Sequence, residues 1–343
     1  MTIRAKPTIG VDLMGGDHSP INLISGILDL YQLHPLDCHF IFYCQHHYLE
    51  TVQSVLSPLD RRLDISYTLE SHPSAVVLTD APLSAVKSKK DSTLWAGIHS
   101  LKNRVIDAFI TVGNTGALMA TAHYLLEPLL HAERPALMAK LPHPDRTVMV
   151  LDVGANSNAS ARQLYQFAMM GSAYFRAMGR REFHAGILNI GSEEHKGKAE
   201  HKELYGMIKE LHRKNPDLLP YFVGNVEPQD VLRGRCDLVI TDGFAGNIFL
   251  KSAEGTAQLI QRAIRHLPSE LLTESQVHGV MQALNPFFDH QQGPGALLIG
   301  LDGLVIKCHS YFDGKALYHA IKHALQLIEG QLMAKLSRCL SYD

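Results

Sequence analysis

The residues best suited to chemistry in this chain stand where apolar segments end. In the segment "IGVDLMGGDHSP", a predicted buried strand runs into a glycine-rich turn, and its candidate residues are Asp12, Gly15, Gly16, Asp17 and His18. Successive glycines relax the steric limits that a Cβ imposes on a turn, so a ligand can approach this backbone closely. Carboxylate and imidazole groups beside it can orient a nucleophile or transfer a proton. An ordinary turn with Asp17 as the cap of the next helix is the structural alternative.

Other apolar runs end in the same way, in loops that contain glycine together with asparagine or aspartate: "ITVGNTGALMA", "LDVGANSN", "LNIGSEEHKGK", "VGNVEPQD" and "ITDGFAGNIFLKS". The clearest case places a loop between a strand and an apolar helix, with the candidates Gly113, Asn114, Thr115 and Gly116. The first N–H groups and the dipole of that helix favour a phosphate or another small anion. The loop is neither a P-loop nor a GxGxxG fingerprint, so nothing points to ATP or NAD.

The elements that position these loops are predicted to form an α/β fold. Short apolar runs such as "CHFIFYC", "TVMVLDVG" and "CDLVITDG" alternate with amphipathic helical stretches, which is typical of a mostly parallel sheet with helices on both faces. The carboxyl ends of such strands share one crevice where ligands bind. Since no long linker or repeat divides the sequence, we expect a single three-layer α/β/α domain over residues 1–343.

One segment, 254–288, differs from its surroundings. It predicts two helices broken at Pro268, with an apolar stripe of Leu259, Ile260, Ala263, Ile264 and Leu267. Such a stripe is usually buried in a core or in a dimer interface. The alternative is a projecting hairpin that contacts a membrane or an acyl chain.

Composition limits the classes of function. The formal charge of −2 in a chain of 343 residues gives no electrostatic case for binding nucleic acid. No signal peptide and no apolar stretch of membrane-spanning length is found, so a cytoplasmic protein is expected. The pair His319 and His323 has helical spacing but lacks the acidic residue of a zinc motif, and the five cysteines show no CxxC spacing. We therefore expect neither a metal nor a cofactor.

Nine segments in order along the chain carry a resemblance to a known family: "VDLMGGDHSP", "VGNTGALMA", "ERPAL", "LDVGANSN", "QFAMMGSAY", "LNIGSEEHKG", "VGNVEP", "DGFAGNIFLKSAEG" and "GLDGLVIKCH". The chain resembles the PlsX family, the acyl-ACP:phosphate acyltransferases of bacterial phospholipid synthesis. The resemblance implies transfer of a long fatty acyl group from acyl carrier protein to inorganic phosphate. It also implies a homodimeric fold similar to phosphotransacetylases and isopropylmalate dehydrogenases, with peripheral membrane contact for passing acyl phosphate to the next acyltransferase.

The resemblance implies which residues of the matching segments serve catalysis and which bind phosphate or substrate. Asp12, Asp17, His18, Asn114, Asn156 and Asn247 are the candidates for catalysis, and those for phosphate or substrate binding are Gly15, Gly16, Gly113, Thr115, Gly116, Lys196, Lys251 and His309. Phosphate is itself a nucleophile and a thiolate leaves readily, so the site needs proximity and oxyanion donors rather than a covalent nucleophile. This chain departs from the family pattern at Ser157, Asn158 and Ser310.

An acidic carrier protein requires a local basic surface on a chain without net positive charge. The densest basic cluster lies in "VKSKKDS", and its candidates for carrier docking are Lys87, Lys89 and Lys90. Two alternatives remain open: a phosphotransacetylase acting on short acyl-CoA, and a non-catalytic regulator that binds an acyl carrier or an acyl phosphate.

Overall fold

The computed structural model describes residues 6–129, 132–141, 143, 146–267, 272–288 and 294–341. They fall into two compact units, the first made of Met1–Pro135 with Gln291–Asp343 and the second of Ala136–His290. The expectation of one domain over the whole chain stays a prediction.

The first unit is built on a mostly parallel sheet with the strand order β3-β2-β1-β4-β11-β10. Only β10 runs antiparallel to its neighbour β11 in this set. The strands are β1 (Thr8–Asp12), β2 (His39–Gln45), β3 (Ser66–His72), β4 (Ala108–Thr111), β10 (Ala296–Ile299) and β11 (Leu304–Lys307). Strand β2, which follows β1 in the sequence, pairs with one edge of β1, and β4 pairs with the other edge. The loops after β1 and β4 therefore flank the point where the strand order reverses, which is where open α/β sheets bind ligands.

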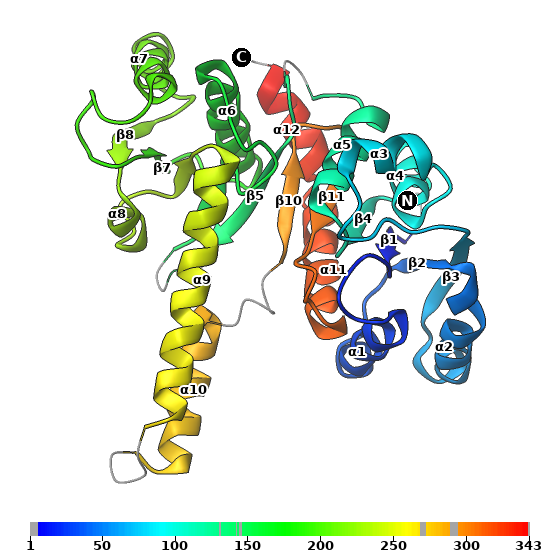
Figure 1. The fold of residues 1–343 in the computed structure, drawn as a ribbon. Coiled ribbons are helices and arrows are strands. Elements are labelled where there is room, and N and C mark those ends of the chain that lie inside the picture. The colour runs from blue at the N-terminus through cyan, green and yellow to red at the C-terminus, as the bar shows by residue number, and fades with distance from the viewer. Residues whose placement is uncertain are drawn as a thin grey trace, which may run out of the picture. The chain divides into compact units, whose positions relative to one another are not determined.

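Helices cover both faces of this sheet (Figure 1). On one face of the sheet, α1 packs against α2 and α11. On the other face, α4 packs on β1, β2 and β4 and lies beside α5. The helical elements are α1 (Pro20–Leu33), η1 (His46–Tyr48), α2 (Leu49–Leu63), α3 (Pro82–Ser88), α4 (Thr93–Lys102), α5 (Thr115–Leu125), α11 (Gly314–Glu329) and α12 (Leu332–Ser341).

The first helix shows how the sequence specifies these layers. The Ser19 hydroxyl accepts the Asn22 N–H and Pro20 opens the first turn, which are strong start signals. Leu23, Ile24, Ile27, Leu28 and Tyr31 then form its buried stripe, at the spacing of one helical face. The helix packs against α11 and α2. The helix is therefore specified both by its cap and by its apolar period.

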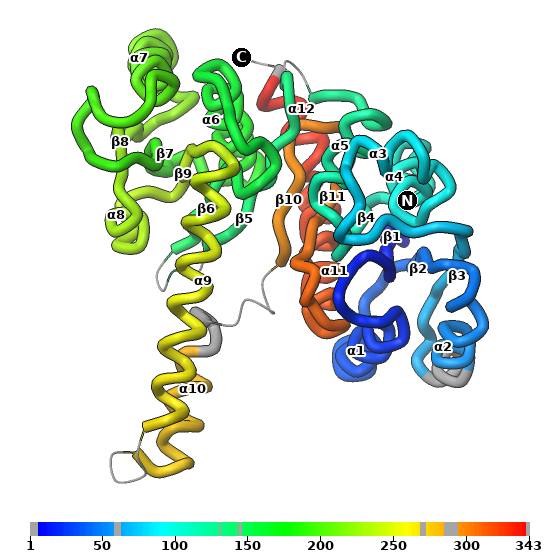
Figure 2. The backbone as a smooth tube through the Cα atoms, in the orientation of Figure 1, coloured from blue at the N-terminus to red at the C-terminus, as the bar shows by residue number. Residues whose placement is uncertain are grey.

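The second unit carries a sheet of order β5-β6-β9-β7-β8 in which only β5 is antiparallel to its neighbour. Its strands are β5 (Ala136–Leu141), β6 (Val148–Leu151), β7 (His184–Leu188), β8 (Tyr221–Val226) and β9 (Leu238–Ile240). Helices α6 and α7 lie on one face and α8 and α9 on the other, as Figure 2 traces along the backbone. The helices are α6 (Ala161–Ala177), α7 (Ala199–Lys214), α8 (Pro228–Leu232), α9 (Gly243–Arg265) and α10 (Glu274–Phe288).

Helices α9 and α10 pack side by side as a hairpin of the second unit (Figures 1 and 2). The predicted stripe is not buried in a core of this chain, because Leu259 is 67% exposed, Ile260 43% and Leu267 39%. The predicted break at Pro268 lies outside the described residues. Among the described residues, no helix is both long and apolar enough to cross a membrane. Whether the hairpin contacts a partner subunit, a membrane or an acyl chain stays a prediction.

The predicted α/β class with a mostly parallel sheet is confirmed by both units. Two strands were not foreseen from the sequence, the polar strand β3 and the antiparallel strand β5. The segment "ALLIGLDGLVIK" forms the antiparallel hairpin of β10 and β11, and the glycine and asparagine of "VGNV" lie inside β8 rather than after it.

Candidate functional site

The candidate site of the first unit begins with a row of polar side chains at the carboxyl ends of adjacent parallel strands. Asp12 on β1 is in register with Thr111 on β4, and Thr111 is in register with Lys307 on β11. The Thr111 hydroxyl donates to Asp12 Oδ2 at 3.2 Å and accepts the Gly113 N–H at 3.1 Å. This hydroxyl therefore links the buried carboxylate to the loop that follows β4.

Asp12 is almost completely buried. Burial raises the pKa of its carboxyl group from 3.8 to about 7, although hydrogen bonds from the Met14 N–H and the Thr111 hydroxyl act in the opposite direction. A group with this pKa changes its protonation state near neutral pH, as a catalytic acid or base must. Asp12 is therefore the candidate acid or base with the strongest physical support.

The glycine turn after β1 is fixed by close contacts with neighbouring loops. Gly15 has a φ of +81°, and a Cβ added there would lie 2.6 Å from the Val76 carbonyl oxygen. A Cβ on Gly16 would lie 3.0 Å from the Ser310 carbonyl oxygen. Both glycines are thus required by conformation or by space, and their turn is enclosed by the loops around residues 76 and 310.

The side chains after the glycines tie the turn to residues 309–311. The Asp17 N–H donates to the Ser310 carbonyl at 2.8 Å, and the Ser310 hydroxyl donates to Asp17 Oδ2 at 2.9 Å. His18 Nε2 lies 3.2 Å from the Tyr311 carbonyl oxygen and donates to it. The alternative of Asp17 as a helix cap is wrong, because Ser19 is the cap. Ser310, which departs from the family pattern, has a structural role in this chain as a donor to Asp17.

His309 and the loop after β4 complete this group. The His309 ring stacks on Tyr311 with ring centroids 5.0 Å apart. Asn114 is the cap of α5: its Oδ1 accepts the Ala117 N–H, and its Nδ2 donates to carbonyl oxygens of residues 77, 78 and 80. Because its side chain is engaged within the protein, the backbone N–H groups at the start of α5, at Thr115 and Gly116, are the better candidates for holding an anion.

Sequence reasoning missed Lys307. Its side chain is buried, and Nζ donates to the Val112 carbonyl at 3.4 Å and to the Cys308 carbonyl. It places a cation beside the β4 loop, where it favours an anionic ligand. The signal was available in "LVIKCH", because a lysine that ends an apolar strand must lie at the carboxyl end of the sheet.

The second unit carries a separate group of sequence-predicted residues. Asp152, another residue that the sequence reasoning missed, is fully buried and accepts five N–H groups. Two of these come from Asn156, at 2.7 Å from the backbone and 3.0 Å from Nδ2. Burial raises the pKa of Asp152 and the N–H donors oppose that shift. Asn156 thus holds the loop after β6 in shape, and its carbonyl accepts the Gly243 N–H at the start of α9.

Asn247 lies against this loop. A Cβ on Gly154, whose φ is +132°, would lie 3.6 Å from the side-chain carbonyl carbon of Asn247. Lys251 follows one turn later on α9 and is exposed, so the two predicted residues share a helix face. Lys196 belongs to the loop after β7, and its carbonyl accepts Asn189 Nδ2 at 3.1 Å. Lys198 of the same loop, another residue that was missed, pairs with the α9 cap Asp242 at 3.0 Å.

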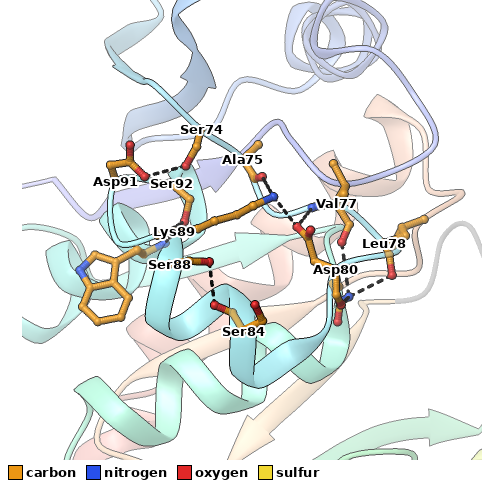
Figure 3. Close-up of polar contacts among 12 residues, drawn as sticks. Ser74, Ala75, Val77, Leu78, Asp80, Ser84, Ser88, Lys89, Asp91 and Ser92 are labelled. Carbon is orange, nitrogen blue, oxygen red and sulfur yellow. Dashed lines mark hydrogen bonds and ion pairs between the residues drawn. The ribbon is translucent and has the colours of Figure 1, made fainter.

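The three predicted docking lysines are in different environments. Lys87 is exposed on α3, and Lys90 Nζ lies 5.5 Å from the ring centroid of Trp95. Lys89 instead forms an ion pair with Asp80 at 2.6 Å and donates to the Ala75 carbonyl at 3.0 Å (Figure 3). The docking role itself stays a prediction for all three. Among the described residues, no three acidic, histidine or cysteine side chains are grouped as metal ligands.

The model of a family described as "Fatty acid synthesis protein" matches residues 7–335. The chain belongs to this family. It is 36% identical over 342 residues to a protein of Chlamydia caviae named phosphate acyltransferase, covering 97% of this chain and 99% of that protein. The resemblance to the PlsX family is confirmed, and so is the enzyme class, since the relatives are named as acyltransferases.

Solved structures confirm the predicted kind of fold. A phosphotransacetylase from Streptococcus pyogenes aligns with a TM-score of 0.59 at 16% identity, over 94% of each chain. A 4-hydroxythreonine-4-phosphate dehydrogenase from Klebsiella pneumoniae aligns with a TM-score of 0.52 at 11% identity, over 94% of this chain and 99% of the other. At these identities the likeness concerns the fold alone.

Proposed function

We propose that this protein transfers a long-chain fatty acyl group from the thioester of acyl carrier protein to inorganic phosphate. The products are an acyl phosphate and the free carrier thiol. The single observation that supports this best is the group at the strand-order reversal of the first unit. There a glycine turn, the N-terminus of α5 and the buried residues Asp12 and Lys307 meet at the carboxyl ends of neighbouring strands.

The reaction is one displacement at the thioester carbonyl. A phosphate oxygen forms a bond to the carbonyl carbon, the C–S bond breaks, and the thiolate takes up a proton as it leaves. The backbone N–H groups of the glycine turn and of the α5 start hold the phosphate, and Lys307 adds positive charge near them. Asp12, with its pKa of about 7, moves the proton in this scheme.

The finer features of the proposal have separate support. A relative of this chain is named phosphate acyltransferase, which supports phosphate as the acceptor. Helix α9 exposes apolar side chains and also carries the exposed residues Arg262 and Arg265. Such a surface suits a membrane, a second subunit or an acyl chain. Exposed Lys87 and Lys90 suit the acidic surface of a carrier protein.

A substrate-range assay tests the proposal. The purified protein is given palmitoyl carrier protein, palmitoyl-CoA and acetyl-CoA in parallel, each with and without phosphate, and thiol release is followed. We expect release that depends on phosphate and is fastest with the carrier thioester. Release from acetyl-CoA alone establishes a short-chain phosphotransacetylase instead. Binding of the carrier without release from any thioester identifies a non-catalytic regulator.

A further inference from the structure

A loop of residues 75–80, here called the 75–80 loop, lies directly against the glycine turn. The space that a Cβ on Gly15 would need is taken by the Val76 carbonyl oxygen, 2.6 Å away, and by the backbone of Gly113 at 3.0 Å. The 75–80 loop therefore forms one wall of the turn, on the side of the β4 loop. Its position decides where the Gly15 backbone can lie.

Apolar burial does not account for the order of the outer part of this loop. Val77 and Leu78 are each 45% exposed, so burying them contributes little to holding the segment in place. The loop instead depends on polar contacts that converge on it from two directions (Figure 3).

The first contact is a charged clamp. Lys89 Nζ lies 2.6 Å from Asp80 Oδ2 and 3.0 Å from the Ala75 carbonyl oxygen, so one ammonium group joins both ends of the loop. Asp80 Oδ2 also accepts the Val77 N–H at 2.8 Å. Burial acts to raise the pKa of Asp80, but the Lys89 and Val77 hydrogen bonds outweigh it and the pKa is lowered. The Asp80 carboxylate is therefore ionised at neutral pH.

The second contact comes from the cap of α5. Asn114 Nδ2 is 3.0 Å from the Leu78 carbonyl oxygen, 3.0 Å from that of Asp80 and 3.4 Å from that of Val77. Its Oδ1 meanwhile accepts the Ala117 N–H. One side chain thus fastens the 75–80 loop to the helix start at which we place the phosphate.

We propose that Lys89, Asp80 and Asn114 are positioning residues, which hold the 75–80 loop against Gly15 and so set the shape of the phosphate site. The inference rests on the proposed function, because the glycine turn is a phosphate wall only if phosphate is the acceptor. It gives Lys89 a task distinct from the carrier docking that the sequence suggested. Lys89 acts through the loop and touches neither substrate.

The test compares Lys89→Met, which keeps the aliphatic stem and removes the charge, with Lys102→Met at the exposed end of α4. KM for phosphate and kcat are measured with palmitoyl-CoA and with palmitoyl carrier protein. We expect Lys89→Met to raise KM for phosphate on the order of ten-fold with both thioesters, because small misplacements of binding groups cost one to two orders of magnitude. Lys89→Arg restores much of the loss, and Lys102→Met behaves like the wild type.

Two results overturn the proposal. If Lys89→Met raises KM only when palmitoyl carrier protein is the thioester and not with palmitoyl-CoA, Lys89 belongs to carrier docking. If KM for phosphate is unchanged with both thioesters, the clamp does not position the turn. Loss of folded protein alone would lower the apparent kcat and leave KM unchanged, so the two effects are distinguishable.

A second measurement does not depend on activity. Hydrogen exchange of the amides in residues 75–80 is compared between the wild type and Asp80→Asn, which keeps the side-chain volume. We expect faster exchange across the 75–80 loop in the variant, and equal exchange rates contradict the clamp. If no thioester supports turnover in the wild type, the proposed function fails, while this measurement still decides whether the clamp holds the loop.

Discussion

The buried carboxyl group of Asp12 should make the stability of the protein depend on pH in a way that Asp12→Asn removes. In the folded protein its pKa is raised from 3.8 to about 7, so the folded state binds a proton more tightly than the unfolded state does. The contribution of this group is therefore fully present below pH about 4 and is lost as pH rises toward 7. A shift of about 3 units corresponds to about 4 kcal/mol, of which about 3 kcal/mol falls between pH 5 and pH 8.

The assay is denaturant unfolding of both proteins at pH 5, 6, 7 and 8. Asparagine does not titrate, so the free energy of unfolding of the wild type should fall relative to that of Asp12→Asn by about 3 kcal/mol across this range. Altered hydrogen bonds to Met14 and Thr111 shift the variant by a constant amount and leave the slope untouched. A difference between the two proteins that stays the same at all four pH values would refute the argument that burial raises this pKa.

Three further predictions concern other parts of the site. Asp152→Ala leaves five buried N–H groups without their acceptor, and should lower the free energy of unfolding by about 3 kcal/mol; an unchanged denaturation midpoint would contradict this. In Gly15→Ala the new alanine must adopt a φ of +81° and displace the Val76 carbonyl. The substitution should therefore lower the free energy of unfolding by about 1–2 kcal/mol and raise KM for phosphate. A variant with wild-type stability and KM would show that the turn is not constrained. Lys87→Glu should weaken binding of the carrier thioester several-fold at low salt and less at high salt; equal KM values at both salt concentrations would place carrier docking elsewhere.

Much of the architecture was predictable because local signals agreed with the fold. The buried parallel strands are short apolar runs, and β1, β4, β6 and β9 end at the glycine-rich or acidic loops that the sequence marks. Where the signals were weak, prediction failed for physical reasons. Strand β3 lies at the edge of its sheet and is only partly buried, so its residues show no continuous apolar run. In β5, Lys140 interrupts an otherwise buried pattern.

The candidate site was predictable in its loops but not in the tasks of individual side chains. Spacing placed Asp12, the glycines and the start of α5 at strand ends, and the structure brings them together. It did not reveal that the side chains of Asn114 and Lys89 both bind the 75–80 loop. Their partners there lie 34 to 37 residues from Asn114 and 9 to 14 residues from Lys89 in the sequence. Such long-range pairings depend on the fold and leave no periodic trace in the sequence. Lys307 was missed for the opposite reason, since its local signal was clear but was taken as part of a strand.

The most direct test of the account is to look for the acyl phosphate itself. The purified protein is incubated with palmitoyl carrier protein and phosphate, and acyl phosphate is trapped with hydroxylamine while free thiol is counted in the same sample. The account predicts one palmitoyl hydroxamate for each thiol released, and neither product when phosphate is left out. Thiol released without phosphate, or without an acyl phosphate that can be trapped, would contradict phosphate as the acceptor.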